Sequence, residues 1–319
     1  MNNLINYDDF LLESKGISDI TLEYKNMIWK DLKNMISEYE KEQTKYGKIF
    51  TKIFNEKYNF DNTLFKIKNL QLNIKILKYH ENVCNGIIYN KDCYIDDNNF
   101  LNNLIINLEI YVKNFDNIFL IEVESLLLHE MVHGFQIYKS IDKSVDSNWL
   151  LGSMIPNMRN MIKNDSIKNI LYLLYRSLKH ELSAQIHQYY DYKLKSEKYE
   201  KIFTIISLFE NFNPCDISIN DENIKDLNII RRNYINNLED ESPNNLYFRN
   251  VNFNWKKEIT KDNIQKFLLM LNDIFKKSVK YLENKIKLVD NKLQESEIFK
   301  YTHKTCYVFA EIMSYKKEL

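Results

Sequence analysis

The sequence predicts an α+β protein that is predominantly helical, and two observations carry this prediction. Only 5 glycines and 3 prolines occur in 319 residues, so the residues that most often interrupt helices are scarce. Apolar residues recur at helical spacing toward both ends of the chain, whereas they alternate with polar residues between about 64 and 112. We therefore expect a small sheet in the first half of the chain, with helices before and after it.

Residues 18–57 are expected to form one or two amphipathic helices. Their apolar side chains recur three or four positions apart, at Leu22, Met27, Ile28, Leu32, Met35 and Ile36. Such spacing gathers the apolar residues on one face of a helix. The segment 1–60 is accordingly predicted to be a helical unit that packs on the core.

Three strands are expected next, at 64–79, 85–89 and 103–112. The first, "LFKIKNLQLNIKILKY", alternates apolar and polar residues, as a half-buried strand does. The second, "NGIIY", follows a turn, and the third, "NLIINLEIYV", is β-branched and bounded by Asn-rich turns.

Two strong helices follow the strands, from about 118 to 139 and from about 166 to 195. The first is apolar almost all round, which indicates that it is buried in the core. Residues 141–165 contain glycine and proline and are expected to be a long connection. Together these elements make 61–195 the predicted core domain.

The remaining segment, 196–319, is predicted to be a helical C-terminal region. It contains the apolar run "EKIFTIISLFENF", a helical pattern near Ile229, and two long helical patterns at 261–289 and 293–317.

Composition bounds the function classes. Lysine and arginine balance aspartate and glutamate at 44 each, which gives no electrostatic reason to expect nucleic acid or an anionic membrane as a partner. The N-terminus lacks a signal-peptide pattern, and no apolar run approaches the ~20 residues that span a bilayer, so we expect a cytoplasmic protein or one released without a classical signal. The abundance of Asn, Lys and Ile is typical of an AT-rich genome, such as those of some bacteria and phages.

Cysteine usage excludes a further kind of site. The chain has 4 cysteines, at positions 84, 93, 215 and 306, and none of them lies in C-x-x-C spacing. We therefore expect neither a cysteine metal site nor a disulfide framework.

The motif that indicates chemistry is "HEMVH", with His129, Glu130 and His133 in H-E-x-x-H spacing. Residues four apart lie on one side of a helix, so both imidazoles point toward one place. Neutral imidazole is a good ligand for Zn²⁺. Glu130 then lies beside the metal, where a general base takes a proton from water. The alternative is a pair of core histidines that bond to backbone carbonyls.

A zinc hydrolase usually has a third protein ligand. The pattern that supplies a third histidine would need glycine at 136 and histidine at 139, but Gln136 and Lys139 stand there. Glu181 lies 48 residues after His133, on the apolar stripe of the predicted helix at 166–195. An unpaired carboxylate is penalised in such a place, so Glu181 is the predicted third ligand. Ala184, one turn later, is small enough to allow close packing against the helix of the motif.

Other residues compete for the role of third ligand. His180 and His187 share a face of the same helix adjacent to that of Glu181, so either is an alternative ligand or an outer partner of the site. Asp146 and Asp165 are weaker alternatives.

On "HEMVH" and the later "ELSAQ", the chain resembles the zincin metallopeptidases of the gluzincin type, over about residues 60–195. The order of elements is similar to the zincin core, in which a small twisted sheet is followed by an active-site helix and a glutamate helix. The N-E-x-x-S-D sequel of the thermolysin-like branch is absent.

The resemblance implies a peptide substrate that lies antiparallel to an exposed edge strand. It also implies a Tyr, His or Arg that stabilises the oxyanion of the reaction. The candidates for this role, or for an outer partner of the site, are near the glutamate helix: Tyr175, Arg176, His180, His187 and Tyr190.

The predicted function is hydrolysis of peptide bonds by a zinc metallopeptidase, with a peptide or protein as partner and Zn²⁺ as cofactor. His129, His133 and Glu181 are the predicted ligands, and Glu130 is the predicted base. The alternative is a non-catalytic structural protein or virion cargo protein with a stabilising metal site, suggested by the large helical additions. A toxin-type protease that acts on one host protein is a third interpretation. The sequence does not predict the oligomeric state.

Overall fold

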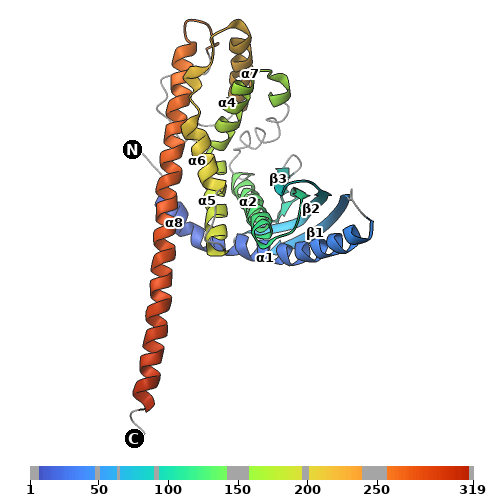
Figure 1. The fold of residues 1–319 in the computed structure, drawn as a ribbon, viewed down its shortest axis with the longest axis vertical. Coiled ribbons are helices and arrows are strands. Elements are labelled where there is room, and N and C mark those ends of the chain that lie inside the picture. Colours follow the sequence, from blue (N-terminus) through green and yellow to red (C-terminus); the bar gives the residue numbers. More distant parts are fainter. Residues whose placement is uncertain are drawn as a thin grey trace.

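The computed structural model describes residues 7–46, 51–62, 65–89, 93–141, 158–195, 201–238 and 257–315. Its elements are α1 (Tyr7–Tyr46), β1 (Thr51–Asp61), β2 (Lys66–Lys78), β3 (Val83–Tyr89), β4 (Tyr94–Ile95), β5 (Leu101–Asn102), β6 (Ile105–Val112), α2 (Asn117–Ile141), α4 (Asp165–Arg176), α5 (Lys179–Lys195), α6 (Lys201–Asn211), a 3₁₀ turn (Pro214–Asp216), α7 (Asp221–Leu238) and α8 (Ile264–Tyr315). The predicted class, α+β and predominantly helical, is confirmed. Figure 1 shows the sheet on one side of α2 and helices α4 to α8 on the other, with α1 running below the sheet and α2 in this view.

The sheet is built around β2. Strand β1 pairs antiparallel with β2 along one edge, and β6 pairs parallel with β2 along the other, where Gln71 is opposite Ile105. The short strand β5 continues the β6 edge, and Asn103, at φ 62°, stands between β5 and β6. Strand β3 pairs antiparallel with β6 and with no other strand among the described residues, so β3 is an edge strand.

Two apolar cores lie on either side of α2. The first is formed by the sheet, α1 and one face of α2, which contributes Leu127 and Met131. The second is formed by helices α4 to α8. On its other face α2 contributes Leu128 and Val132, which pack against Ala184 of α5. Since alanine has the smallest side chain that keeps helix propensity, it allows α5 to approach α2 closely, as the sequence predicts.

A buried charge cluster ties three helices together. Lys25 of α1 is fully buried and its Nζ lies 2.6 Å from Oε1 of Glu124 on α2 and 3.4 Å from Oδ1 of Asp191 on α5. Lys195 of α5 bridges the same two carboxylates, with Nζ 2.7 Å from an oxygen of each. Oγ of Ser125 donates to Asp191 at 3.1 Å. Removing one partner from such a cluster leaves a buried charge uncompensated, so it holds α5 in one position along α2.

The N-terminal prediction is wrong at its end. Residues 51–57 were expected to continue a helix, but they form the first part of β1, and α1 ends at Tyr46. Strand β1 pairs with β2 from Thr51 opposite Leu77 to Asp61 opposite Lys66, with one shift of register between Tyr58 and Phe60. The hydrogen bonds of this long antiparallel ladder outweigh the local helical pattern.

The helix predicted at 166–195 is two helices. Helix α4 ends at Arg176, where the Ser177 hydroxyl donates to the Leu174 carbonyl at 2.7 Å and the Ser177 N–H bonds to the carbonyls of the last turn. Helix α5 begins at Lys179, so Glu181 lies in its first turn. The predicted stripe survives the break, because Ile170, Leu174, Leu178, Glu181 and Gln185 are all buried.

The C-terminal prediction is also wrong, because it divides one helix into two. The two helices expected at 261–289 and 293–317 are one helix, α8, which extends well beyond the rest of the molecule (Figure 1). Its sequence contains neither glycine nor proline, so no residue interrupts its hydrogen bonds.

The connection predicted at 141–165 lies mostly outside the described residues, which resume with a helical turn at 158–161. Within the described part of the chain, no helix is both long and apolar enough to cross a membrane.

Candidate metal centre

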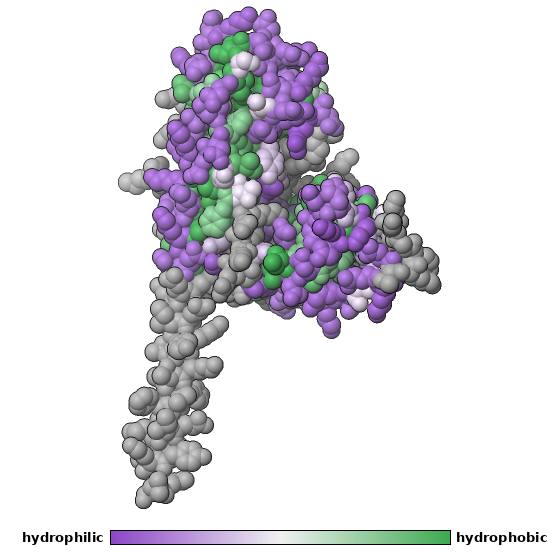
Figure 2. Space-filling view, viewed as in Figure 1, coloured by the Kyte–Doolittle hydropathy of each residue, from purple (hydrophilic) through white to green (hydrophobic). Residues whose placement is uncertain are grey.

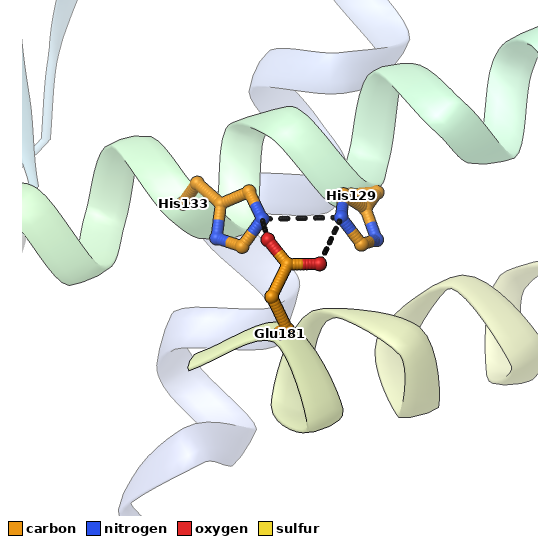
Figure 3. A group of neighbouring side chains, drawn as sticks. All are labelled: His129, His133 and Glu181. Carbon is orange, nitrogen blue, oxygen red and sulfur yellow. Dashed lines mark hydrogen bonds and ion pairs between the residues drawn. The ribbon is translucent and has the colours of Figure 1, made fainter. Parts of the chain in front are cut away.

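Helix α2 brings the two histidines of the motif together. His129 and His133 are one turn apart and are 5% and 3% exposed. Their Nε2 atoms lie 3.1 Å apart, and the two rings are nearly perpendicular. Figure 3 shows both rings on the same side of α2, turned toward Glu181 of α5.

Glu181, the residue predicted as the third ligand, lies beside the two histidines. Its Oε1 lies 3.1 Å from Nε2 of His133, and its Oε2 lies 3.7 Å from Nε2 of His129. Possible ligand atoms of the three residues all lie within 4.8 Å of one another. Ligand atoms ~2.0–2.1 Å from a tetrahedral zinc ion are separated by about 3.3–3.4 Å. The spacing of the three side chains is therefore close to that of three ligands around one metal ion.

Gln136 sets the orientation of one of these histidines. Its Oε1 lies 2.9 Å from Nδ1 of His133, one turn earlier on α2. An amide oxygen only accepts, so in this hydrogen bond Nδ1 carries the proton. Nε2 then keeps its lone pair, which is the tautomer that a metal ligand requires.

Two residues at the end of α4 hold the carboxylate of Glu181. The Tyr175 hydroxyl donates to Oε1, and Nη1 of Arg176 lies 3.3 Å from Oε2. Burial raises the pKa of Tyr175 well above 10.0, and the charge of Glu181 raises it further. Burial would lower the pKa of Arg176, but the Glu181 carboxylate outweighs this effect and raises it. Both side chains therefore stay protonated and remain hydrogen-bond donors.

Glu130 lies beside the cluster against the backbone of the edge strand. A Cβ added to Gly86 of β3 would lie 2.5 Å from Oε1 of Glu130 and 2.8 Å from its Cδ. A glycine is thus required for this side chain to lie where it does, because any other residue would displace it. Glu130 is buried and lines the same cavity as His129 and Glu181.

A cavity of about 680 Å³ opens onto the cluster. Its walls come from β3, α2, α4, α5 and α6, and its described lining residues are Asn82, Val83, Cys84, Asn85, Gly86, Ile87, Glu122, Leu126, His129, Glu130, Arg159, Tyr172, Tyr175, Arg176, Glu181, Gln185, Gln188, Thr204, Ile205 and Leu208. Leu208 and Phe203 of α6 are each about half exposed, and Figure 2 shows an apolar strip along this helical half of the molecule. Of these two residues, Leu208 lines the cavity, whose wall combines polar and apolar side chains.

The other predicted ligands whose side chains the structure describes, His187 and Asp165, are not part of the cluster. His187 bonds through Nδ1 to the Ser183 carbonyl at 2.9 Å, and burial lowers its pKa. Neither His187 nor Tyr190 is among the described residues that line the cavity. The side chain of His180, and Asp146 altogether, lie outside the described residues, and Asp165 forms an exposed pair with Lys168.

Some residues of the site carried no signal in the sequence. Gly86, Gln188 and Arg159 line the cavity from three different segments, and none belongs to a recognisable motif. The scarcity of glycine is the one available hint for Gly86, because each of the 5 glycines is more informative in such a chain.

The buried pair of His133 and Glu181 predicts a pH dependence for the metal-free protein. Burial would raise the pKa of Glu181, but His133, His129 and Arg176 lower it well below 4.5. The charged Glu181 side chain therefore stabilises the fold above pH 4.5, and this stabilisation is lost as the pH falls through the pKa that Glu181 has in the folded protein. Burial would lower the pKa of His133, but Glu181 raises it above 6.5. The protonated His133 ring therefore stabilises the fold below pH 6.5, and this stabilisation is lost as the pH rises through the pKa that His133 has in the folded protein.

We therefore compare the free energies of unfolding of the chelator-treated wild type and of Glu181→Gln. The wild type should be the more stable of the two, and the difference should be largest between pH 4.5 and 6.5. Denaturant titrations of both proteins across the pH range measure this difference. A difference that keeps growing as the solution becomes alkaline would contradict the proposed pairing.

Comparisons with protein-family models, with curated proteins and with solved structures found no match for this chain. The molecule is thus defined by its own features: a mixed α+β fold with a buried cluster of two histidines and a glutamate that can hold a metal ion.

Proposed function

We propose that the chain is a zinc-dependent metallopeptidase with a zincin-like core, in which α2 is the active-site helix and α5 is the glutamate helix. One observation carries this proposal: the atoms of His129, His133 and Glu181 converge at the wall of a cavity that Glu130 also lines. Three protein ligands beside an accessible cavity are typical of catalytic zinc sites, whereas structural sites are closed by four.

His129, His133 and Glu181 would hold the ion, and Gln136 would keep His133 in the ligand tautomer. Zn²⁺ in this position supplies a Lewis acid that makes water nucleophilic at neutral pH and polarises a peptide carbonyl. Glu130 accepts the proton of the attacking water and transfers it to the leaving amine. Its carboxylate is kept against Gly86, so it needs little rearrangement to act.

The donors for the oxyanion are Tyr175 and Arg176. Both line the cavity and both already direct a donor toward the Glu181 carboxylate. A phenol and a guanidinium that stay protonated stabilise negative charge that develops on a carbonyl oxygen. This assignment is supported by the cavity lining, which includes Tyr175 and Arg176 but neither His187 nor Tyr190 among the described residues.

The substrate backbone would pair with β3. Residues 82–87 line the cavity, and β3 is an edge strand among the described residues. An extended peptide adds to such an edge through main-chain hydrogen bonds. This arrangement puts a peptide bond beside Gly86 and therefore beside Glu130.

The proposal is tested with the purified full-length chain. We expect about one zinc per chain by elemental analysis, and cleavage of a peptide library that stops with chelator and returns with Zn²⁺. A chain that binds one zinc and cleaves no peptide would refute the peptidase and favour the structural or virion role, for which the extended α8 is the supporting feature.

The contact between Gly86 and Glu130 predicts the effect of one added methyl group. Gly86→Ala should displace the Glu130 carboxylate and lower kcat by about 100-fold, because misplacement of a catalytic group by ~1 Å has an effect of this size. Zinc content should not change, because no ligand is touched. Steady-state kinetics and elemental analysis measure the two quantities.

The matched control is Gly134→Ala, which adds the same methyl group 2.9 Å from Cδ2 of Leu104 in the sheet core. The added methyl group overpacks the core, and overpacking of this kind costs about 1–3 kcal/mol of the free energy of unfolding. The value of kcat should stay within tenfold of the wild type. Equal losses of kcat in both variants would contradict a specific role for Gly86.

A further inference from the structure

Two glutamines of α5 extend the cavity wall beyond the candidate metal centre. Gln185 and Gln188 are each 1% exposed, and both line the cavity together with Glu181. The three residues are four and three positions apart, so they follow one face of the helix. Since the helix rises ~1.5 Å per residue, the two amides lie about 6 and 10 Å from Glu181 along its axis.

Each glutamine presents a polar atom with no partner in the described part of the chain. Oε1 of Gln185, an acceptor, and Nε2 of Gln188, a donor, are both buried and unbonded. Most buried polar atoms in proteins are hydrogen-bonded, and each exception requires an explanation. Leaving such an atom unsatisfied is unfavourable, so each of the two atoms favours a bound group that completes its hydrogen bond.

The pair of atoms defines the ligand chemically. A group that satisfies both must donate to Gln185 and accept from Gln188. A carboxylate has no proton to donate, an ammonium has no lone pair with which to accept, and an aliphatic group does neither. A hydroxyl does both through one oxygen, and a carboxamide does both through two separate atoms, which suits two amides that stand three residues apart on the helix.

We propose that Gln185 and Gln188 form a subsite for a carboxamide, so that the preferred substrates carry an asparagine or glutamine side chain near the scissile bond. This inference rests on the proposed peptidase function. An extended peptide rises ~3.4 Å per residue, so the side chain belongs to a residue within about three positions of the cleaved bond. Thr204 and Leu208 of α6 also line the cavity.

The first test needs no hydrolysis. The zinc-loaded wild-type chain, labelled with ¹⁵N-glutamine, is titrated with the N-acetyl methylamides of glutamine, glutamate, serine and leucine, which differ only in the side chain. The side-chain NH₂ signal of Gln188, identified by its absence in Gln188→Leu, should move with the glutamine compound and not with the other three. A shift with the serine compound as large as with the glutamine compound, equal shifts with all four, or none with the glutamine compound, would overturn the subsite.

The second test uses cleavage. A peptide library should be cut with asparagine or glutamine enriched at one fixed position, and Gln185→Leu or Gln188→Leu should lower kcat/KM for such a peptide by roughly 10- to 100-fold relative to its leucine analogue. The control Gln265→Leu makes the same change on an exposed face of α8 and should not alter the ratio.

The results distinguish failure of the subsite proposal from failure of the peptidase proposal. Cleavage without any preference for asparagine or glutamine overturns the subsite and leaves the peptidase intact. Absence of all cleavage, together with a selective shift by the glutamine compound, refutes the peptidase and retains the carboxamide site. Thermal melts and zinc content of each variant show whether it folds, and the titration of the unmodified chain does not depend on that result.

Discussion

Replacement of Glu130 by glutamine should lower kcat for peptide hydrolysis by about 10²–10⁴-fold and leave zinc content unchanged. The range is what a positioned general base contributes. Glutamine has nearly the same shape as glutamate, so the packing of this side chain against Gly86 is kept while its ability to accept a proton is removed. Single-turnover kinetics with a cleaved library peptide measure the chemical step, and elemental analysis measures the metal.

The control for this variant is Glu122→Gln. Glu122 lies two turns before Glu130 on α2 and lines the same cavity, so the change in charge at the cavity wall is identical. Glu122 is outside the set of residues that we assign to metal binding or catalysis, and its replacement should change kcat by less than tenfold. Comparable losses in the two variants would show that cavity charge, and not a base at Glu130, controls the rate.

The parts of the fold that were predictable from the sequence are those set by local periodicity. Strand β6 alternates strictly between buried and half-buried residues, and α2 is buried on nearly all sides, so both have a clear pattern. Strand β1 was missed because its residues are mostly exposed and its strand conformation depends on pairing with β2, which is a non-local contact.

The break between α4 and α5 was missed for a related reason. Ser177 ends α4 through its own hydroxyl, and serine is tolerated inside helices as well as at their ends. The apolar stripe continues across the break without a change of phase, so periodicity alone indicates one helix. The consequence is functional, because the break makes Glu181 part of a first helical turn next to Tyr175 and Arg176.

The candidate ligands were predictable because each carries a local signal. His129 and His133 are four apart on a helix, and Glu181 is an acidic residue on an apolar stripe. The contact of Gly86 with Glu130 and the shape of the cavity were not predictable, since they depend on segments that are distant in the chain. Nothing in the sequence around Gly86 indicates that it lies against Glu130, and nothing around Gln188 indicates that it lines a cavity.

Replacement of Glu181 by glutamine should weaken zinc binding by more than about 100-fold. Loss of a partner that only supports a ligand reduces affinity by about 10–100-fold, and loss of the charge of a direct ligand should exceed that range. Glutamine still has an oxygen that accepts from Tyr175, so the local hydrogen bond is kept while the negative charge opposite His133 and Arg176 is removed. Competition titrations against a chromophoric chelator measure the dissociation constant.

The same titrations distinguish Glu181 from the histidines that compete for its role. His187→Ala should leave zinc affinity within tenfold of the wild type, because His187 bonds to the Ser183 carbonyl and is absent from the cluster. His180→Ala is made in parallel as the second competitor. If Glu181→Gln kept wild-type affinity while either histidine variant lost it, the ligand set would change. Glu130 would then remain beside a metal held by three histidines, and Glu181 would serve only to bind Tyr175 and Arg176.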